Sequence, residues 1–282
     1  MGGRVWIATV VTFARCLVTH EVPLLAAAIA YTAVLSFFPL LVGVVALLAR
    51  WVEEPRAQQA VVEALRPYLP PGAVSLVWGT LDAAIRARGA ASVVATVVLF
   101  WTATAAASTI RHSLNRVLGA ARPRPFWRRK VIEFGLVTLA GGLISLSLIA
   151  SAALAALGAV PALADAVRAL RVSPMATTLA RVSPWVLSVA AFAVVYAWLP
   201  NVRLAWRTLA VGTLTAAALF EATKQAFFWY LRVLADYPLV YSHLAGVVVL
   251  MIWIYLAAFV LLMGAEVMRQ LEDRRQVTAD VG

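Results

Sequence analysis

Four runs of membrane-spanning length contain no charged residue: Leu24 to Ala49, Ala90 to Ile110, Phe134 to Val160 and Leu244 to Ala265. An α-helix rises 1.5 Å per residue, so about 20 apolar residues cross the hydrocarbon core of a bilayer. Only 13% of the residues are charged and 63% are hydrophobic, whereas soluble domains carry about 25% charged residues. The chain is therefore predicted to be all-α: a polytopic integral membrane protein.

The apolar runs predict six transmembrane helices within a single domain that covers residues 1–282. They extend from about Leu24 to Ala49, Ala90 to Ile110, Phe134 to Val160, Trp185 to Leu199, Leu209 to Leu234 and Leu244 to Ala265. The fourth run is short and is expected to begin near Pro184. Pro39 removes a backbone hydrogen bond inside the first run, so a kink is predicted there.

Short amphipathic helices complete the predicted fold. Residues 4–20 place apolar side chains at near-helical spacing, which predicts a helix that lies at the membrane interface. Residues 50–89 mix acidic and basic side chains, with Pro67, Pro70 and Pro71 in the middle, and predict short helices outside the membrane.

Arginine placement predicts the orientation. Seven basic residues fall between positions 111 and 130, and Arg269, Arg274 and Arg275 follow the last span. Cytoplasmic loops carry such an excess, so both termini are expected in the cytoplasm, with 50–89 on the outer side and 266–282 as a cytoplasmic tail. The same rule accounts for the net charge of +11 without nucleic acid as a partner.

The fifth predicted span contains Glu221 and Lys224. Thr213, Gln225 and Arg232 fall on the same third of a helical wheel. Two interpretations remain open: an i,i+3 ion pair that only stabilises the bundle, or a polar translocation path, which intramembrane charges often mark. The predicted path consists of Glu221, Lys224, Gln225 and Thr213, with Thr32 and Ser36 of the first span.

The basic loop also has two interpretations. Its arginines either set the topology alone or also bind anionic lipid headgroups. The residues for such lipid contact are Arg122, Arg124, Arg128, Arg129 and Lys130.

Catalytic motifs are missing from the sequence. Cys16 is the only cysteine, and the three histidines do not share metal-ligand spacing. Neither a Walker loop nor a Gly-x-Ser-x-Gly elbow occurs. We therefore expect no enzymatic activity, no cofactor and no metal.

An ordered set of motifs resembles the YihY/BrkB family of bacterial inner-membrane proteins over about residues 10–268. The motif positions are Tyr31, Pro39, Asn115, Pro200, Asn201, Glu221, Lys224, Trp253, Tyr255, Gly264 and Glu266. In one departure, this chain has Tyr241-Ser242 where the family usually has Tyr-Gly.

The resemblance implies a six-helix, multi-pass protein of the bacterial plasma membrane. It also brings an older ribonuclease label, which nothing in these residues supports, and a suggested involvement in lipid export. Two function classes follow. One is a translocator of a lipid or other amphiphilic or small solute; the other is an envelope scaffold or accessory subunit whose 50–89 helices dock a partner. Membrane lipids are the expected partners, and a second copy of the chain or an envelope protein could also bind.

Overall fold

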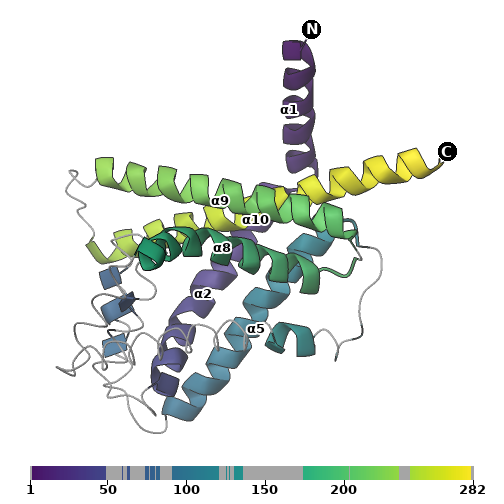
Figure 1. Cartoon of the computed structure of the whole chain (residues 1–282). Helices are drawn as coiled ribbons and strands as arrows, with labels where there is room; N and C mark the ends of the chain where they lie inside the picture. The colour runs from purple at the N-terminus through teal and green to yellow at the C-terminus, as the bar shows by residue number, and fades with distance from the viewer. Residues whose placement is uncertain are drawn as a thin grey trace.

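The computed structural model describes residues 2–48, 59, 62–63, 74–75, 77–79, 81–82, 91–120, 125, 127, 130–135, 174–202, 204–234 and 242–280. Every regular element within this part of the chain is helical, which confirms the predicted all-α class (Figure 1). The long helices are α1 (Gly2–Thr19), α2 (Val22–Leu48), α5 (Ala91–Val117), α8 (Pro174–Trp198), α9 (Trp206–Leu234) and α10 (Ser242–Asp280).

Helix α1 leaves the body of the protein at a sharp corner. The segments Val11–Thr19 and Val22–Phe37 meet at 54°, and Glu21 at the break has a positive φ of 54°. The N-terminal end of α1 points away from the other helices (Figure 1). The interfacial position expected for residues 4–20 stays a prediction.

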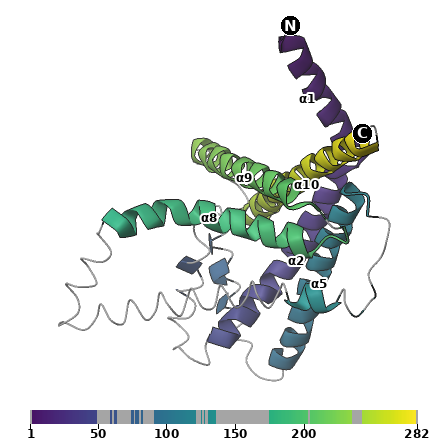
Figure 2. The ribbon, with the colours of Figure 1, turned by 45° about the vertical axis from the view of Figure 1, so that its right-hand side comes forward.

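Helix α10 is the centre of the bundle. It packs against α2, α5 and α9, and α8 packs against α9 (Figure 2). The core joins side chains from all five of these helices, among them Ile29, Leu114, Tyr196, Ala216 and Leu262. Helix association in lipid depends on close packing and internal hydrogen bonds, because lipid tails are as apolar as leucine.

Two glycines allow α9 and α10 to cross closely. A Cβ atom on Gly264 would lie 2.8 Å from the Cβ of Ala216 and would also collide with the Tyr196 hydroxyl. A Cβ atom on Gly212 would collide with the Met268 side chain. Small residues at such crossings let the two backbones approach each other.

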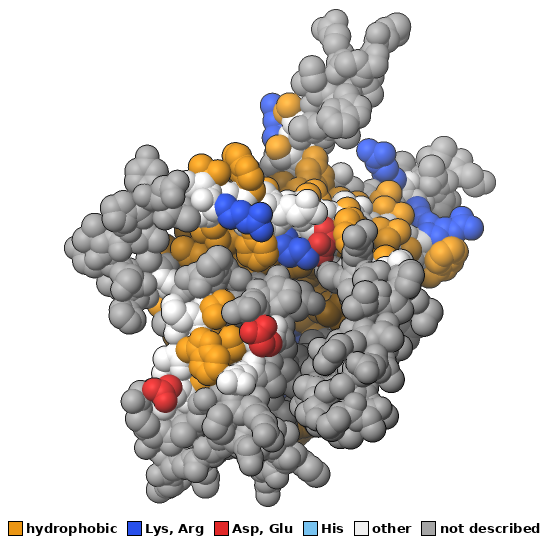
Figure 3. All heavy atoms as spheres, turned by 60° about the vertical axis from the view of Figure 1, so that its left-hand side comes forward, with side chains coloured by type: hydrophobic (Ala, Val, Ile, Leu, Met, Phe, Trp, Pro, Cys, Tyr) orange, Lys and Arg blue, Asp and Glu red, His pale blue; other side chains and the backbone are white. Residues whose placement is uncertain are grey.

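Large apolar side chains cover the outward faces of the bundle. Leu187 on α8, Leu214 and Trp229 on α9 and Ile252 on α10 are all exposed, as is Tyr31 on α2. Figure 3 shows hydrophobic side chains gathered on one such face. Exposed apolar side chains of this kind suit contact with lipid tails.

Several helix boundaries agree with the sequence, and others differ. Helix α2 matches the run predicted from Leu24 to Ala49, and α9 starts three residues before Leu209. Helix α8 begins at Pro174 instead of near Pro184, which is favourable because a proline at the first helical position loses no hydrogen bond. Helix α5 continues past Ile110 to Val117, and α10 continues through the predicted tail to Asp280.

Helix α2 continues through Pro39 as one helical segment. The kink predicted at this residue stays a prediction. One turn earlier, Ser36 Oγ donates to the Thr32 carbonyl oxygen at 2.7 Å. Most of the third predicted span and of the segment 50–89 lies outside the described residues.

Within the described residues, one helix is long and apolar enough to cross a membrane, from Gly246 to Arg275. The bent pair Val11–Thr19 and Val22–Phe37 meets the same criterion only when both parts are taken together. The count of six spans stays a prediction.

Candidate functional site

Glu221 lies near the middle of α9 and is buried. Lys224 Nζ lies 2.6 Å from Glu221 Oε2. Ser188 Oγ on α8 donates to Glu221 Oε1 at 2.8 Å. Both carboxylate oxygens therefore have a partner. A buried charge is strongly disfavoured unless it is paired and hydrogen-bonded, and Glu221 has both kinds of partner.

Lys224 is the more accessible member of the ion pair. Its side chain is 13% exposed, compared with 4% for Glu221. The ammonium group also lies 5.8 Å from the ring centroid of Phe220, within cation–π range.

The ion pair lies on the inward face of α9. Thr213, Ala217 and Glu221 are buried, and helical spacing places Lys224 on the same side. Gln225 is exposed and lies away from this face. The predicted polar stripe also included Arg232, which is exposed as well. The residues of the predicted stripe that lie on the inward face of α9 are therefore Thr213, Glu221 and Lys224.

Of the hydroxyl groups predicted beside the pair, Thr32 and Ser36 donate within α2, whereas Thr213 lies on the same face of α9 as the pair. Thr32 Oγ1 donates to the Ala28 and Ile29 carbonyl oxygens of its own helix. Thr213 Oγ1 is buried and has no hydrogen-bond partner among the described residues. Ser188, which supplies the third polar group, was not predicted, because a single serine in an apolar run carries no signal of its partner.

An aromatic cluster closes one side of the ion pair. Trp253 on α10 is only 5% exposed. Its ring centroid lies 5.3 Å from Phe227, 5.6 Å from Phe220 and 5.7 Å from Phe228. The faces of these rings are largely covered by one another, so the cluster forms a packed wall.

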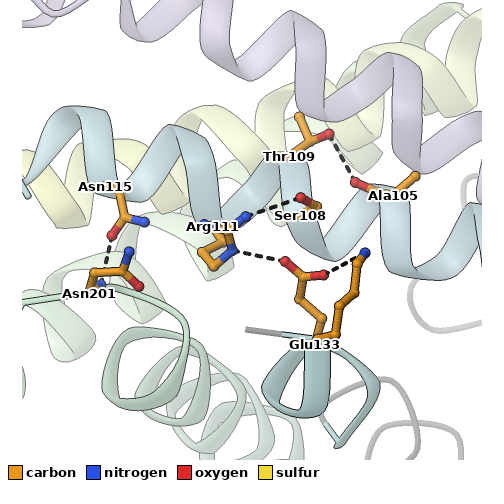
Figure 4. Close-up of polar contacts among 8 residues, drawn as sticks. Ala105, Ser108, Thr109, Arg111, Asn115, Glu133 and Asn201 are labelled. Carbon is orange, nitrogen blue, oxygen red and sulfur yellow. Dashed lines mark hydrogen bonds and ion pairs between the residues drawn. The ribbon is translucent and has the colours of Figure 1, made fainter. Parts of the chain in front are cut away.

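A second buried ion pair joins α5 to the segment 130–135 (Figure 4). Arg111 Nε donates to Glu133 Oε1 at 2.9 Å, and Arg111 Nη2 donates to Ser108 Oγ at 3.2 Å. Lys130 Nζ lies 3.1 Å from Glu133 Oε2, within ion-pair distance but without the alignment of a hydrogen bond. Glu133 is fully buried, so this contact fixes the segment onto α5.

The predicted lipid-binding residues are mostly outside the described part of the chain, since Arg122, Arg124, Arg128 and Arg129 all fall there. Lys130 is described, and its side chain is 37% exposed. Their lipid contact stays a prediction.

Several motif residues meet at one end of the bundle. The backbone N–H of Asn201 donates to Asn115 Oδ1 at 2.7 Å (Figure 4). His20 Nδ1 lies 2.8 Å from Oε2 of the buried Glu266. Pro200 is buried beside Asn201.

The same end contains two further polar contacts and a pocket. Arg116 Nη2 lies 2.7 Å from Glu21 Oε2, and Thr208 Oγ1 donates to Glu272 Oε2 at 2.8 Å. A pocket of ≈ 360 Å³ lies between Gly119, Leu204 and Glu272. These contacts join the ends of α5, α9 and α10 with the corner between α1 and α2.

Two further motif residues, Gly264 and Tyr255, pack within the bundle, whereas Tyr31 is exposed. Gly264 lies at the crossing of α9 and α10, and Tyr255 stacks against Phe259 with ring centroids 6.1 Å apart. Across the described part of the chain, no group of three His, Cys, Asp or Glu side chains could hold a metal ion.

The sequence matches the family described as Virulence factor BrkB over residues 13–281. A UPF0761 membrane protein of Paraburkholderia xenovorans is 29% identical over 247 residues, 87% of this chain and 55% of that relative. Another of Pseudoalteromonas atlantica is 33% identical over 58% of this chain and 53% of the relative. A third, of Aliivibrio salmonicida, is 29% identical over 89% of this chain and 79% of its own length.

The chain thus spans about half of the length of the first two relatives. No solved structure matches it. The relatives are named membrane proteins, which agrees with the prediction made from the apolar runs. Because the family match covers most of the sequence, the chain belongs to the BrkB family and is an integral membrane protein of bacterial type.

Proposed function

We propose that this protein crosses the bacterial plasma membrane several times, has both termini in the cytoplasm, and moves a lipid or other amphiphilic or small solute past Glu221 and Lys224. The observation that carries the proposal is the buried Glu221–Lys224–Ser188 group in the middle of α9. Movement of this kind needs no covalent step, so we propose a non-enzymatic role.

The exposure of Lys224 supports translocation over a purely structural ion pair. A pair that only stabilises the bundle is best kept dry, since water weakens the attraction between its charges. Lys224 lies on the inward face of α9, yet 13% of its side chain is accessible. This accessibility, on the side where α8 and α10 pack, is the feature expected of a group that meets a solute.

Reconstitution tests the proposal directly. The purified protein is inserted into vesicles, and the movement of headgroup-labelled lipids and small solutes is followed for the wild type and for Glu221→Gln, Lys224→Met and the double variant. The single variants leave one buried charge without its partner and should be less stable than the double variant. The double variant should fold but lose movement.

Thr215→Val is the matched control on the same helix. Its hydroxyl donates to the Val211 carbonyl oxygen of the preceding turn at 2.8 Å, so this change should leave movement intact. A folded double variant with undiminished movement would reduce the ion pair to a structural contact. A wild type that moves nothing would instead favour an envelope scaffold or accessory subunit.

A further inference from the structure

We infer that the solute handled at this site is anionic, and that a phosphate or carboxylate group, on a lipid headgroup or free, binds to the ammonium group of Lys224. The inference rests on the proposed function, because it names the class of solute that the same site would take. Three features of the site favour an anion.

The first feature is that the ammonium group of Lys224 has hydrogen-bond donors that Glu221 does not use. Glu221 accepts from Ser188 through Oε1 and faces Lys224 through Oε2, so each of its oxygens already has a polar partner. An ammonium group carries three N–H donors. Only one of them is needed for Glu221, which leaves donors for an incoming oxyanion.

The second feature is accessibility. The carboxylate is only 4% exposed, and the ammonium group belongs to the more accessible side chain. A solute that reaches the pair from its exposed side therefore meets the positive charge first. A cation would have to pass or displace Lys224 before it could reach Glu221.

The third feature is that the aromatic rings near Lys224 pack against one another. A quaternary ammonium group would need open ring faces for cation–π binding. Trp253 stacks with Phe227 at an interplanar angle of 23° and with Phe228 at 25°. The ring of Trp253 is thus covered by its neighbours, and Phe220 already lies beside Lys224.

The neighbouring carboxylate limits how tightly an anion can bind. Lys224 would lie between two negative groups, so the anion experiences repulsion from Glu221 as well as attraction to the ammonium group. Movement along a path requires a site that is strong enough to be entered and weak enough to be left. The paired arrangement meets this requirement better than an isolated lysine would.

The test exchanges the two charges. The double variant Glu221→Lys with Lys224→Glu keeps an i,i+3 ion pair but puts the carboxylate at the more accessible position. Vesicles containing the wild type or the exchanged variant are loaded separately with fluorescent phosphatidylglycerol, fluorescent phosphatidylcholine, a cationic lipid analogue and inorganic phosphate. The wild type should move the anionic lipid or phosphate roughly tenfold faster than the cationic analogue, and the exchanged variant should lose or reverse this preference.

A second pair of variants covers a failure of the exchanged protein to fold. Lys224→Arg keeps the positive charge and should keep the preference for anions. The neutral double variant Glu221→Gln with Lys224→Met, which should lose movement, should not move the anionic probes. Movement of phosphate without movement of phosphatidylglycerol would identify a free anion as the solute, and the opposite result would identify a lipid headgroup.

The outcomes separate this inference from the proposed function. If the wild type moves the anionic, zwitterionic and cationic lipids at equal rates, the inference is wrong and the proposed function stands. A preference for the cationic analogue has the same consequence. If the wild type moves none of the four probes, both are wrong.

Discussion

The backbone N–H of Asn201 donates a hydrogen bond of 2.7 Å to Oδ1 of Asn115, a residue 86 positions earlier in the chain. The contact joins the last turns of α5 to the turn between α8 and α9 (Figure 4). It gives a physical reason for two motif positions, because a side-chain oxygen at Asn115 satisfies a backbone donor that the turn leaves without a helical partner.

Replacement of Asn115 by alanine should therefore destabilise the protein by about 1 kcal/mol, because the partly buried Asn201 donor loses its acceptor. Asn115→Asp keeps an acceptor oxygen at the same place and should be milder. Thermal unfolding of both variants in detergent micelles measures the difference. Equal stability of the alanine and aspartate variants would contradict the assigned role of this oxygen.

Gly264→Ala should disrupt the crossing between α9 and α10. The new Cβ atom would lie 2.8 Å from the Ala216 Cβ and against the Tyr196 hydroxyl, which itself donates to the Leu261 carbonyl oxygen at 2.6 Å. Overpacking of this kind costs about 1–3 kcal/mol. A lower midpoint of thermal unfolding is expected.

Gly135→Ala is the matched control for this substitution, because nothing lies within 4 Å of a Cβ atom built there. It should leave the unfolding midpoint close to that of the wild type. A Gly264→Ala protein as stable as Gly135→Ala would show that the helices can separate without cost.

The helices that the sequence predicted well are those whose ends coincide with a change in composition. Helix α2 ends where the uncharged run ends, and α9 ends at Leu234, close to Asp236 and Pro238. The fourth predicted span, Trp185 to Leu199, coincides with the apolar part of α8 from Trp185 to Trp198, and the helix itself begins earlier, at Pro174, and continues through Pro184. Prolines terminate helices only when the lost hydrogen bond is not tolerated.

The ion pair between Glu221 and Lys224 was predictable because both charges lie on one helix, where spacing determines proximity. The contacts of Glu221 with Ser188 and of Arg111 with Glu133 were not. Each joins separate segments, and their side chains meet only through the packing of the helices. Arg111 and Glu133 also lie near predicted span ends, where charge is common and indicates no partner.

The orientation of the chain can be tested by labelling introduced cysteines. In a Cys16→Ser background, Ala120→Cys should be protected from a membrane-impermeant reagent added to intact cells, and Ala60→Cys should react. The arginine excess between residues 111 and 130 is the reason for this expectation. Permeabilised cells provide the control, since both cysteines should then react. The reverse labelling pattern would invert the proposed topology.

The last prediction concerns the buried pair of Arg111 and Glu133. Glu133→Gln preserves the shape of the side chain but removes the negative charge that faces Arg111 Nε at 2.9 Å. An arginine left without its ionic partner in a buried site costs about 3–5 kcal/mol, so this variant should unfold at a clearly lower temperature. The double variant Arg111→Met with Glu133→Leu removes both charges and should recover most of the loss. Asp273→Asn is the matched control, because Asp273 is 66% exposed and lies 3.8 Å from Arg269; an exposed pair of this kind contributes about 1 kcal/mol or less. If Glu133→Gln is as stable as Asp273→Asn, the buried contact does not fix the segment 130–135 onto α5.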